Sequence, residues 1–258
     1  MANTEKPVIL LVHGAWHSPG YYKTLINPLR KAGYTVLAPP LATAGPDDSI
    51  IGKTIADDVK RVHETLLPQL DAGRQAVVVA HSYGGMPATE SCAGHTVEER
   101  MAKGLKGGIK AMVYITAYAL DKAGKKLVDY EPASHFFDVN VGHETGVSVL
   151  RPHPASQVFY EADIPCDTDR EGAVRFLGDH SAVAFLTPAA LGAAELRVPK
   201  TYIVCTRDDC ISPSKQRLMA EGCGEGTKIV ELDAGHSPFV VDRHVERLVE
   251  EIEAAACS

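Results

Sequence analysis

The sequence predicts an α/β fold with an open, mostly parallel sheet of about six strands flanked by helices. Short apolar runs rich in valine and isoleucine recur along the chain, as expected for strands that are buried on both faces. Amphipathic segments separate these runs, and this alternation is typical of a parallel sheet wrapped by helices. The expected strands cover residues 8–12, 34–38, 76–80, 111–116, 201–205 and 228–232.

Amphipathic segments predict the flanking helices. Apolar residues recur at helical spacing in the segment 54–70, and Thr54 with Asp57 has the pattern of an N-terminal capping box. The segment 244–256 repeats apolar residues in the same way, so we expect a helix that closes the domain.

The alternation breaks between about residues 118 and 195, which is too long for a connecting loop. We therefore expect a core formed by 1–117 and 196–258, with 118–195 inserted as a cap or lid. An insertion after a strand of an open parallel sheet lies above the ligand crevice. Its aromatic residues predict an apolar substrate face, although packing within the cap explains them as well. They are Tyr130, Phe136, Phe137, Phe159 and Tyr160.

Composition excludes several classes of partner. The net charge of −7 argues against nucleic acid or an anionic membrane, because both require a basic surface. Apolar runs stay well below the roughly 20 residues of a membrane span, and the N-terminus carries no basic leader, so we expect a cytoplasmic protein. The six cysteines lack zinc-site spacing and are expected to be reduced packing residues, without a metal. A small-molecule substrate is the expected partner. The sequence leaves open whether the chain forms a homodimer.

The stretch AVVVAHSYGGM, residues 76–86, has the strand–turn–helix context of a nucleophile elbow, with Ser82 at its apex. Ala80 stands where the G-x-S-x-G pattern has its first glycine, whereas Gly84 keeps the second. A structural turn in which Ser82 only caps a helix explains the short pattern equally well. The decision therefore depends on residues elsewhere in the chain.

A serine nucleophile needs a base and an orienting acid, which in this kind of fold follow in the order serine, acid, histidine. His236 comes directly after the last expected strand, where Gly235 permits a sharp loop. The acid is expected after the strand at 201–205, where Asp208 and Asp209 stand. Asp121, which follows the strand at 111–116, is the alternative.

An acyl-transfer site also needs two backbone N–H groups directed at the developing oxyanion. One is expected from Tyr83, the residue after the nucleophile. The other is expected from Ala15, in the loop HGAW that follows the first strand. Five further residues are candidates for contact with substrate, although packing explains Trp16 and His81 equally well. The candidates are Gly14, Trp16, His17, His81 and His180.

Four motifs, VHGAWH, AHSYGG, VCTRDD and DAGHS, resemble the α/β-hydrolase family. The resemblance is to the branch of plant methylesterases, salicylate-binding esterases and hydroxynitrile lyases, with their microbial relatives. In that branch the strand before the acid reads approximately Y-x-x-C-T-x-D, which implies Asp208 as the acid. The hydroxynitrile lyases carry threonine at the position of Gly14 and lysine at that of Ser237, so both departures favour an esterase.

The expected function is hydrolysis of an ester or lactone of a small, largely apolar molecule, without a cofactor. Ser82, His236 and Asp208 would form the catalytic triad and Ser82 would carry the acyl group. Two alternatives remain open. The same triad supports carbon–carbon bond cleavage, by a retro-Claisen hydrolase or lyase, and the same fold supports a receptor-like protein that binds a small ligand.

Overall fold

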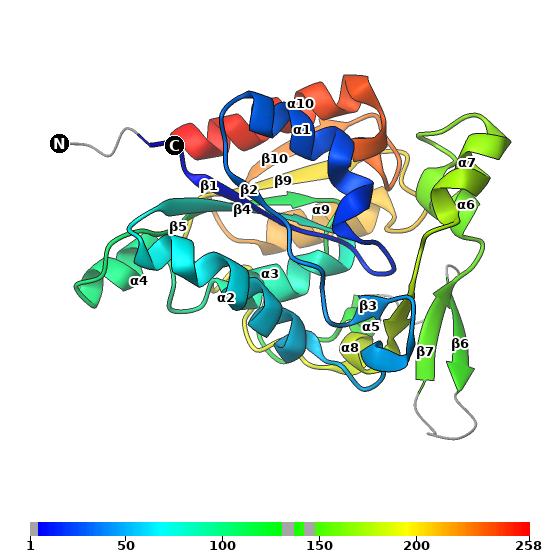
Figure 1. The fold of residues 1–258 in the computed structure, drawn as a ribbon, viewed down its shortest axis with the longest axis horizontal. Helices are drawn as coiled ribbons and strands as arrows, with labels where there is room; N and C mark the ends of the chain where they lie inside the picture. Colours follow the sequence, from blue (N-terminus) through cyan, green and yellow to red (C-terminus); the bar gives the residue numbers. More distant parts are fainter. Residues whose placement is uncertain (1–4, 131–136, 142–147) are drawn as a thin grey trace.

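The computed structural model of the chain describes residues 5–130, 137–141 and 148–258. Its central feature is a six-stranded parallel sheet in the order β10-β9-β5-β4-β1-β2, which confirms the predicted fold class (Figure 1). All six predicted strands are present, although the edge strand β2 is reduced to two residues. The strands are β1 Val8–Val12, β2 Val36–Leu37, β4 Gln75–His81, β5 Gly108–Ile115, β9 Lys200–Cys205 and β10 Lys228–Leu232.

Helices cover both faces of this sheet because alternate strand residues point to opposite sides. Leu10 of β1 packs in the cluster that contains α2 and α3, whereas its neighbour Leu11 packs with α1 and α10. The predicted helices are confirmed, and the Asp57 carboxylate accepts the N–H of Thr54 at 2.9 Å. The helices around the sheet are α1 Lys23–Lys31, α2 Ile55–Asp71, α3 Gly85–Ser91, α4 Val97–Ala102, α9 Pro213–Gly222 and α10 Asp242–Cys257.

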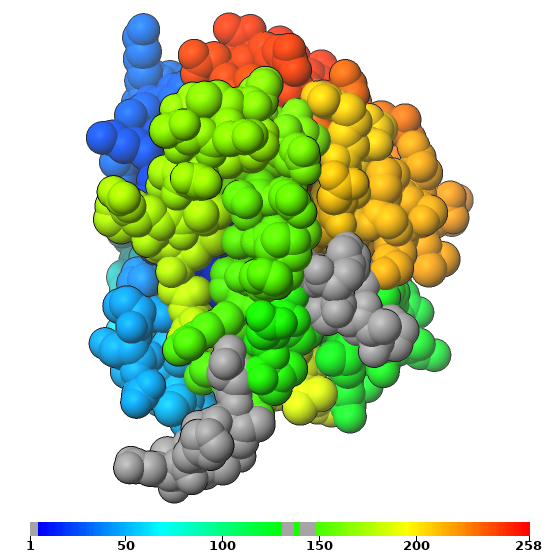
Figure 2. All heavy atoms as spheres, turned by 90° about the vertical axis from the view of Figure 1, so that its right-hand side faces the viewer, coloured from blue at the N-terminus to red at the C-terminus, as the bar shows by residue number. Residues whose placement is uncertain are grey.

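The segment 118–195 carries its own small elements beside the main sheet. Its strands belong to a second, antiparallel sheet in the order β3-β8-β7-β6, and β3 comes from residues 44–45, outside the segment. Figure 2 shows the segment spread over one side of the molecule. The elements are β3 Ala44–Gly45, α5 Leu127–Tyr130, β6 Phe137–Val141, β7 Ser148–Pro152, α6 Ala155–Tyr160, α7 Asp167–Val174, β8 Asp179–Ser181 and α8 Ala182–Leu186.

The cysteines differ from the expectation in one respect. The six cysteines form no disulfide, but the assignment to packing holds only for Cys92, Cys205, Cys210 and Cys223, which are buried. Cys166 and Cys257 are exposed because they lie at the ends of surface helices. None of the helices in the described part of the chain is long and apolar enough to cross a membrane.

The turn after β4 packs directly on the end of β1. A Cβ atom added to Gly84 would lie 2.5 Å from the carbonyl oxygens of both Val12 and His13. These are backbone atoms at the buried end of β1 and of the residue after it, so they cannot move aside cheaply. A glycine is therefore required at this position by the close approach of two chain segments.

We expect Gly84→Ala to lower the free energy of unfolding by about 3 kcal/mol or more, because the added methyl overpacks rigid backbone. The matched control is Gly172→Ala in α7, where nothing lies within 4 Å of the added Cβ. There alanine should be neutral or stabilise by about 1 kcal/mol through its helix propensity. Urea unfolding followed by circular dichroism measures both, and equal stability of the two variants would contradict the close-packing argument.

Candidate active site

The backbone at Ser82 has the geometry of a nucleophile elbow. Strand β4 ends at His81, Ser82 has a φ of +52°, and a short 3₁₀ turn leads into α3. Such a left-handed conformation is uncommon for a residue with a side chain and places Ser82 at the apex of a sharp turn. Ala80 is accommodated because it lies within β4, paired with Val12 and Tyr114, so its methyl group packs in the core.

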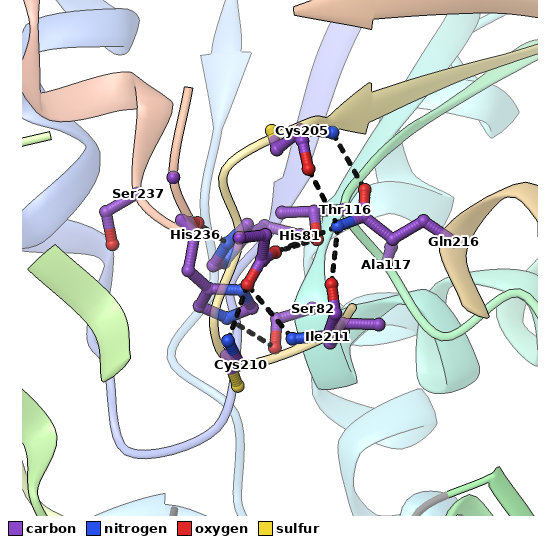
Figure 3. Close-up of polar contacts among 12 residues, drawn as sticks. His81, Ser82, Thr116, Ala117, Cys205, Cys210, Ile211, Gln216, His236 and Ser237 are labelled. Atoms are coloured by element: carbon purple, nitrogen blue, oxygen red, sulfur yellow. Dashed lines mark hydrogen bonds and ion pairs between the residues drawn. The ribbon is translucent and has the colours of Figure 1, made fainter. Parts of the chain in front are cut away.

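Ser82, His236 and Asp208 are brought together from three separate loops. His236 Nε2 lies 3.1 Å from Ser82 Oγ, and His236 Nδ1 lies 2.9 Å from Asp208 Oδ2 (Figure 3). All three residues are buried, with Ser82 only 5% exposed. Since a carboxylate only accepts, His236 carries its proton on Nδ1, which leaves Nε2 free to accept the Ser82 proton.

Asp208 is held by more partners than the histidine alone. Its Oδ1 accepts the N–H groups of Cys210 and Ile211 at 2.7 and 2.9 Å. Its Oδ2 also accepts from Gln216 Nε2 at 3.1 Å and from the Thr116 hydroxyl (Figure 3). These bonds stabilise a charged carboxylate that burial would otherwise disfavour. Sequence reasoning missed Thr116 and Gln216, which come from a neighbouring strand end and from α9.

The two other candidate acids lie elsewhere. Asp209 is exposed, whereas its neighbour Asp208 points inward. Asp121 accepts a hydrogen bond from the Tyr130 hydroxyl at 2.7 Å and does not contact His236. Asp208 is therefore the carboxylate that pairs with His236.

A buried histidine orients the peptide that carries the Ala15 N–H. His13 Nε2 accepts the N–H of Leu41 at 3.0 Å, so its proton is on Nδ1, which donates to the Gly14 carbonyl at 2.8 Å. Because a trans peptide directs its C=O and N–H to opposite sides, this bond turns the Ala15 N–H away from His13. Burial lowers the pKa of His13 to about 4, so the ring stays neutral. Sequence reasoning did not single out His13.

The peptide that carries the Tyr83 N–H is fixed in the same manner. The Ser82 carbonyl accepts the N–H of Tyr118 at 3.0 Å, which turns the Tyr83 N–H to the opposite side. Tyr83 itself is fully buried. The two N–H groups proposed for the oxyanion therefore belong to peptides whose carbonyl groups are occupied elsewhere.

His81 connects the two loops on either side of Ser82. The His236 carbonyl accepts from His81 Nε2 at 2.8 Å, so His81 Nδ1 is left to accept from the Tyr22 hydroxyl at 2.7 Å. The Tyr22 oxygen accepts the N–H of Gly14 at 2.9 Å. Burial, with His236 nearby, lowers the pKa of His81 well below its usual value. Of the two alternatives for His81, these bonds describe a packed structural side chain.

These features agree with the family that comparison finds. The model of the alpha/beta hydrolase family matches residues 9–251. The chain belongs to this family. It is 35% identical over 250 residues to methyl jasmonate esterase 1 of Vitis vinifera, covering 89% of this chain and 90% of the relative. It is 29% identical over 242 residues to a probable hydrolase, R7, of a Phoma species, covering 90% and 92%.

Solved structures show the same fold. The crystal structure of a pyrethroid hydrolase from Sphingobium faniae matches this hydrolase with a TM-score of 0.73 at 20% identity, and 98% of each chain is covered. The resemblance expected from the four motifs is confirmed, because methylesterases are among the relatives.

Trp16, His17 and His180 of the hydrolase lie in an aromatic cluster near the serine. The Trp16 ring stacks on Phe159 with centroids 5.5 Å apart and lies 5.8 Å from the His180 ring. Trp16 Nε1 donates to the Leu150 carbonyl at 2.8 Å. Phe137 and Phe159 therefore contact Trp16, whereas Phe136 lies outside the described residues.

Asp58 is a buried carboxylate that sequence reasoning missed. It accepts the hydroxyls of Tyr83 and Thr43, each at 2.7 Å, and the N–H of Thr43 at 3.0 Å. The available signal was its position between Ile55 and Val62, on the apolar face of α2. Burial raises its pKa from the ordinary 3.8 to about 6 despite these bonds.

We expect the free energy of unfolding of Asp58→Asn to increase, relative to that of wild type, as the pH rises. The raised pKa means that the folded state holds the Asp58 proton more tightly, so wild type loses stability between about pH 4 and 6. Asparagine cannot ionise and avoids this loss, which amounts to about 3 kcal/mol for a shift of about two units. Urea unfolding of both proteins at pH 4 and pH 7 measures it. A stability difference that is the same at both pH values would contradict the assignment.

Proposed function

We propose that this hydrolase is a serine esterase that cleaves an ester or lactone of a small, largely apolar molecule through an acyl-enzyme on Ser82. One observation carries the proposal: a continuous hydrogen-bonded chain from Asp208 through His236 to Ser82. The names of the relatives, which include methyl jasmonate esterase and methylesterase, favour an ester bond.

In this mechanism His236 Nε2 takes the Ser82 hydroxyl proton as the oxygen attacks the carbonyl carbon. Asp208 stabilises the imidazolium that forms. The Ala15 and Tyr83 N–H groups hold the tetrahedral oxyanion, and His236 then protonates the leaving alkoxide. His236 then takes a proton from the water that attacks the acyl-enzyme, and it gives this proton to the Ser82 oxygen as the acid is released.

The substrate would lie against the aromatic cluster, under the segment 118–195, which we propose acts as a cap. Both ring nitrogens of the buried His180 lack a hydrogen-bond partner in the described structure, and the ring lies 4.5 Å from that of Tyr83. Burial lowers the pKa of His180 to about 3, so it is neutral. We propose that it meets a polar atom of the substrate, while Trp16 and Phe159 contact its apolar part.

The position of Gly14 argues against the cyanohydrin chemistry of hydroxynitrile lyases. A Cβ atom added to Gly14 would lie 2.8 Å from His81 Nδ1 and 3.0 Å from Ser82 Cβ. A threonine, which the lyases carry here, would therefore collide with the side chain that connects the two loops. The surroundings of Gly14 therefore leave little room even for the Cβ atom of such a threonine.

We expect Ser82→Ala to reduce kcat/KM for an aryl ester by about 10³-fold or more, because no other nucleophile is positioned in its place. A fluorophosphonate should label wild type and leave the variant unlabelled. The matched control is Ser91→Ala, another buried serine, whose hydroxyl donates to the Ala88 carbonyl at 2.7 Å. If Ser82→Ala kept most of the activity, the assignment of Ser82 as the nucleophile would be wrong. Absence of labelling in wild type would favour the receptor-like alternative.

Product analysis distinguishes ester hydrolysis from carbon–carbon cleavage. Wild type is expected to convert aryl esters and lactones to their acids faster than it cleaves a β-diketone of matched size, since His236 is placed to protonate an alkoxide leaving group. Ser82→Ala measures the background for each substrate. A higher kcat/KM for the β-diketone would reverse the assignment in favour of the retro-Claisen alternative.

A further inference from the structure

Asp163 of the inserted segment binds the loop that carries His236. Its Oδ1 accepts the N–H of Gly235 at 2.8 Å, and its Oδ2 accepts the N–H of Ser237 at 2.9 Å. These two residues flank His236, so one buried carboxylate is hydrogen-bonded to the backbone on both sides of the histidine. Asp163 is only 6% exposed, and charge-assisted bonds to backbone N–H groups are strong in such a setting.

Gly235 is explained by this contact. The sequence suggested that it permits a sharp loop, but it has no positive φ. A Cβ atom at this position would instead lie 2.7 Å from Asp163 Oδ2 and 2.8 Å from Ala162 Cβ. The glycine is therefore needed for the close approach of the inserted segment, and the loop and segment fit each other as a pair.

The same short segment also contacts the loop after β1. The hydroxyl of Tyr160 donates to His17 Nε2 at 2.8 Å, and His17 Nδ1 donates to the Ala15 carbonyl at 2.8 Å. The Phe159 ring lies 5.6 Å from the His236 ring. Residues 159–163 thus contact both the loop of the base and the loop of one oxyanion N–H.

We propose that Asp163 is a positioning residue, which holds the His236 loop at the distance from Ser82 that proton transfer requires. The activity then depends on the position of the inserted segment, because the two hydrogen bonds that fix the His236 loop are made to Asp163 of that segment. This inference rests on the proposed function, since it assigns Asp163 a role in the reaction of Ser82 and His236.

The charges around His236 give this role a distinct pH signature. Asp208 and Asp163 face it with carboxylates, while the nearby rings of His81 and His17 are kept neutral by burial, which lowers their pKa values. His244 of α10 also interacts electrostatically with Asp163, and the charges of Arg243, Arg207 and Asp233 act on His244. Burial raises the pKa of Asp163, whereas the charge of His236 lowers it. Because this attraction is mutual, removing the Asp163 charge should move the acid limb of kcat/KM to lower pH.

The experiment compares Asp163→Asn with Glu195→Gln. Glu195 is the matched control because its Oε2 also accepts two backbone N–H groups, from Ala123 and Gly192, away from the serine. We expect Asp163→Asn to lower kcat for an aryl ester about ten- to a hundredfold, with KM nearly unchanged and the acid limb at lower pH. Glu195→Gln should have the same kcat as wild type and the same acid limb in the pH profile of kcat/KM.

Two further measurements do not depend on how well Asp163→Asn folds. Asp163→Glu keeps the charge but displaces it, so the acid limb should stay in place while kcat falls. In wild type, hydrogen exchange at the Gly235 and Ser237 amides should be as slow as in β10, since both are bonded to a buried carboxylate.

Three results would overturn the inference: a kcat and acid limb of Asp163→Asn like those of wild type, an equal loss in Glu195→Gln, or rapid exchange at both amides. Fluorophosphonate labelling of wild-type Ser82 separates this outcome from failure of the proposed function. If wild type is labelled while Asp163→Asn behaves like wild type, only the role of Asp163 is wrong.

Discussion

The close packing of the turn after β4 on the end of β1 is the constraint on which the rest of the site depends. Gly84 lies against the carbonyls of Val12 and His13, which leaves Ser82 in a left-handed conformation at the apex. This conformation is held because β1 and β4 are hydrogen-bonded neighbours in the sheet. The serine hydroxyl and both candidate oxyanion N–H groups, from Ala15 and Tyr83, then lie at the same strand ends.

Neutral histidines do much of the positioning around this turn. His13 and His81 each have one ring nitrogen that accepts and one that donates, so a single tautomer satisfies all their bonds. Burial keeps both rings uncharged, and the His81 ring, 4.8 Å from that of His236, therefore adds no charge beside it. Rigid, satisfied polar groups of this kind preorganise a site because nothing has to rearrange when charge develops.

The sequence predicted the sheet and the positions of three candidate residues at its strand ends, because both depend on local signals. Strand runs place Ser82, Asp208 and His236 after strands of one parallel sheet, and the ends of such strands meet at one edge. Residues whose roles depend on long-range contacts were missed. Gln216 lies on α9 and Tyr22 on a turn before α1, and neither has a sequence pattern that shows its partner. Asp163 lies in the irregular segment, where periodicity gives no register.

Residues of the segment 118–195 contact two loops of the candidate site, through Asp163 and Tyr160. Trp16 connects this segment to the peptide of Ala15, which directly precedes it in the chain. The Trp16 Nε1 donates to the Leu150 carbonyl of β7, and the Trp16 carbonyl accepts the N–H of Gly178. A displacement of the segment would therefore also shift the peptide that carries the Ala15 N–H. Ser82 and His236 are almost wholly buried, so a substrate of the proposed esterase would have to displace some of the residues that cover them. The residues proposed to contact the substrate are thus connected to the peptide proposed to bind the oxyanion, so we expect changes in specificity and in rate to be linked in this hydrolase.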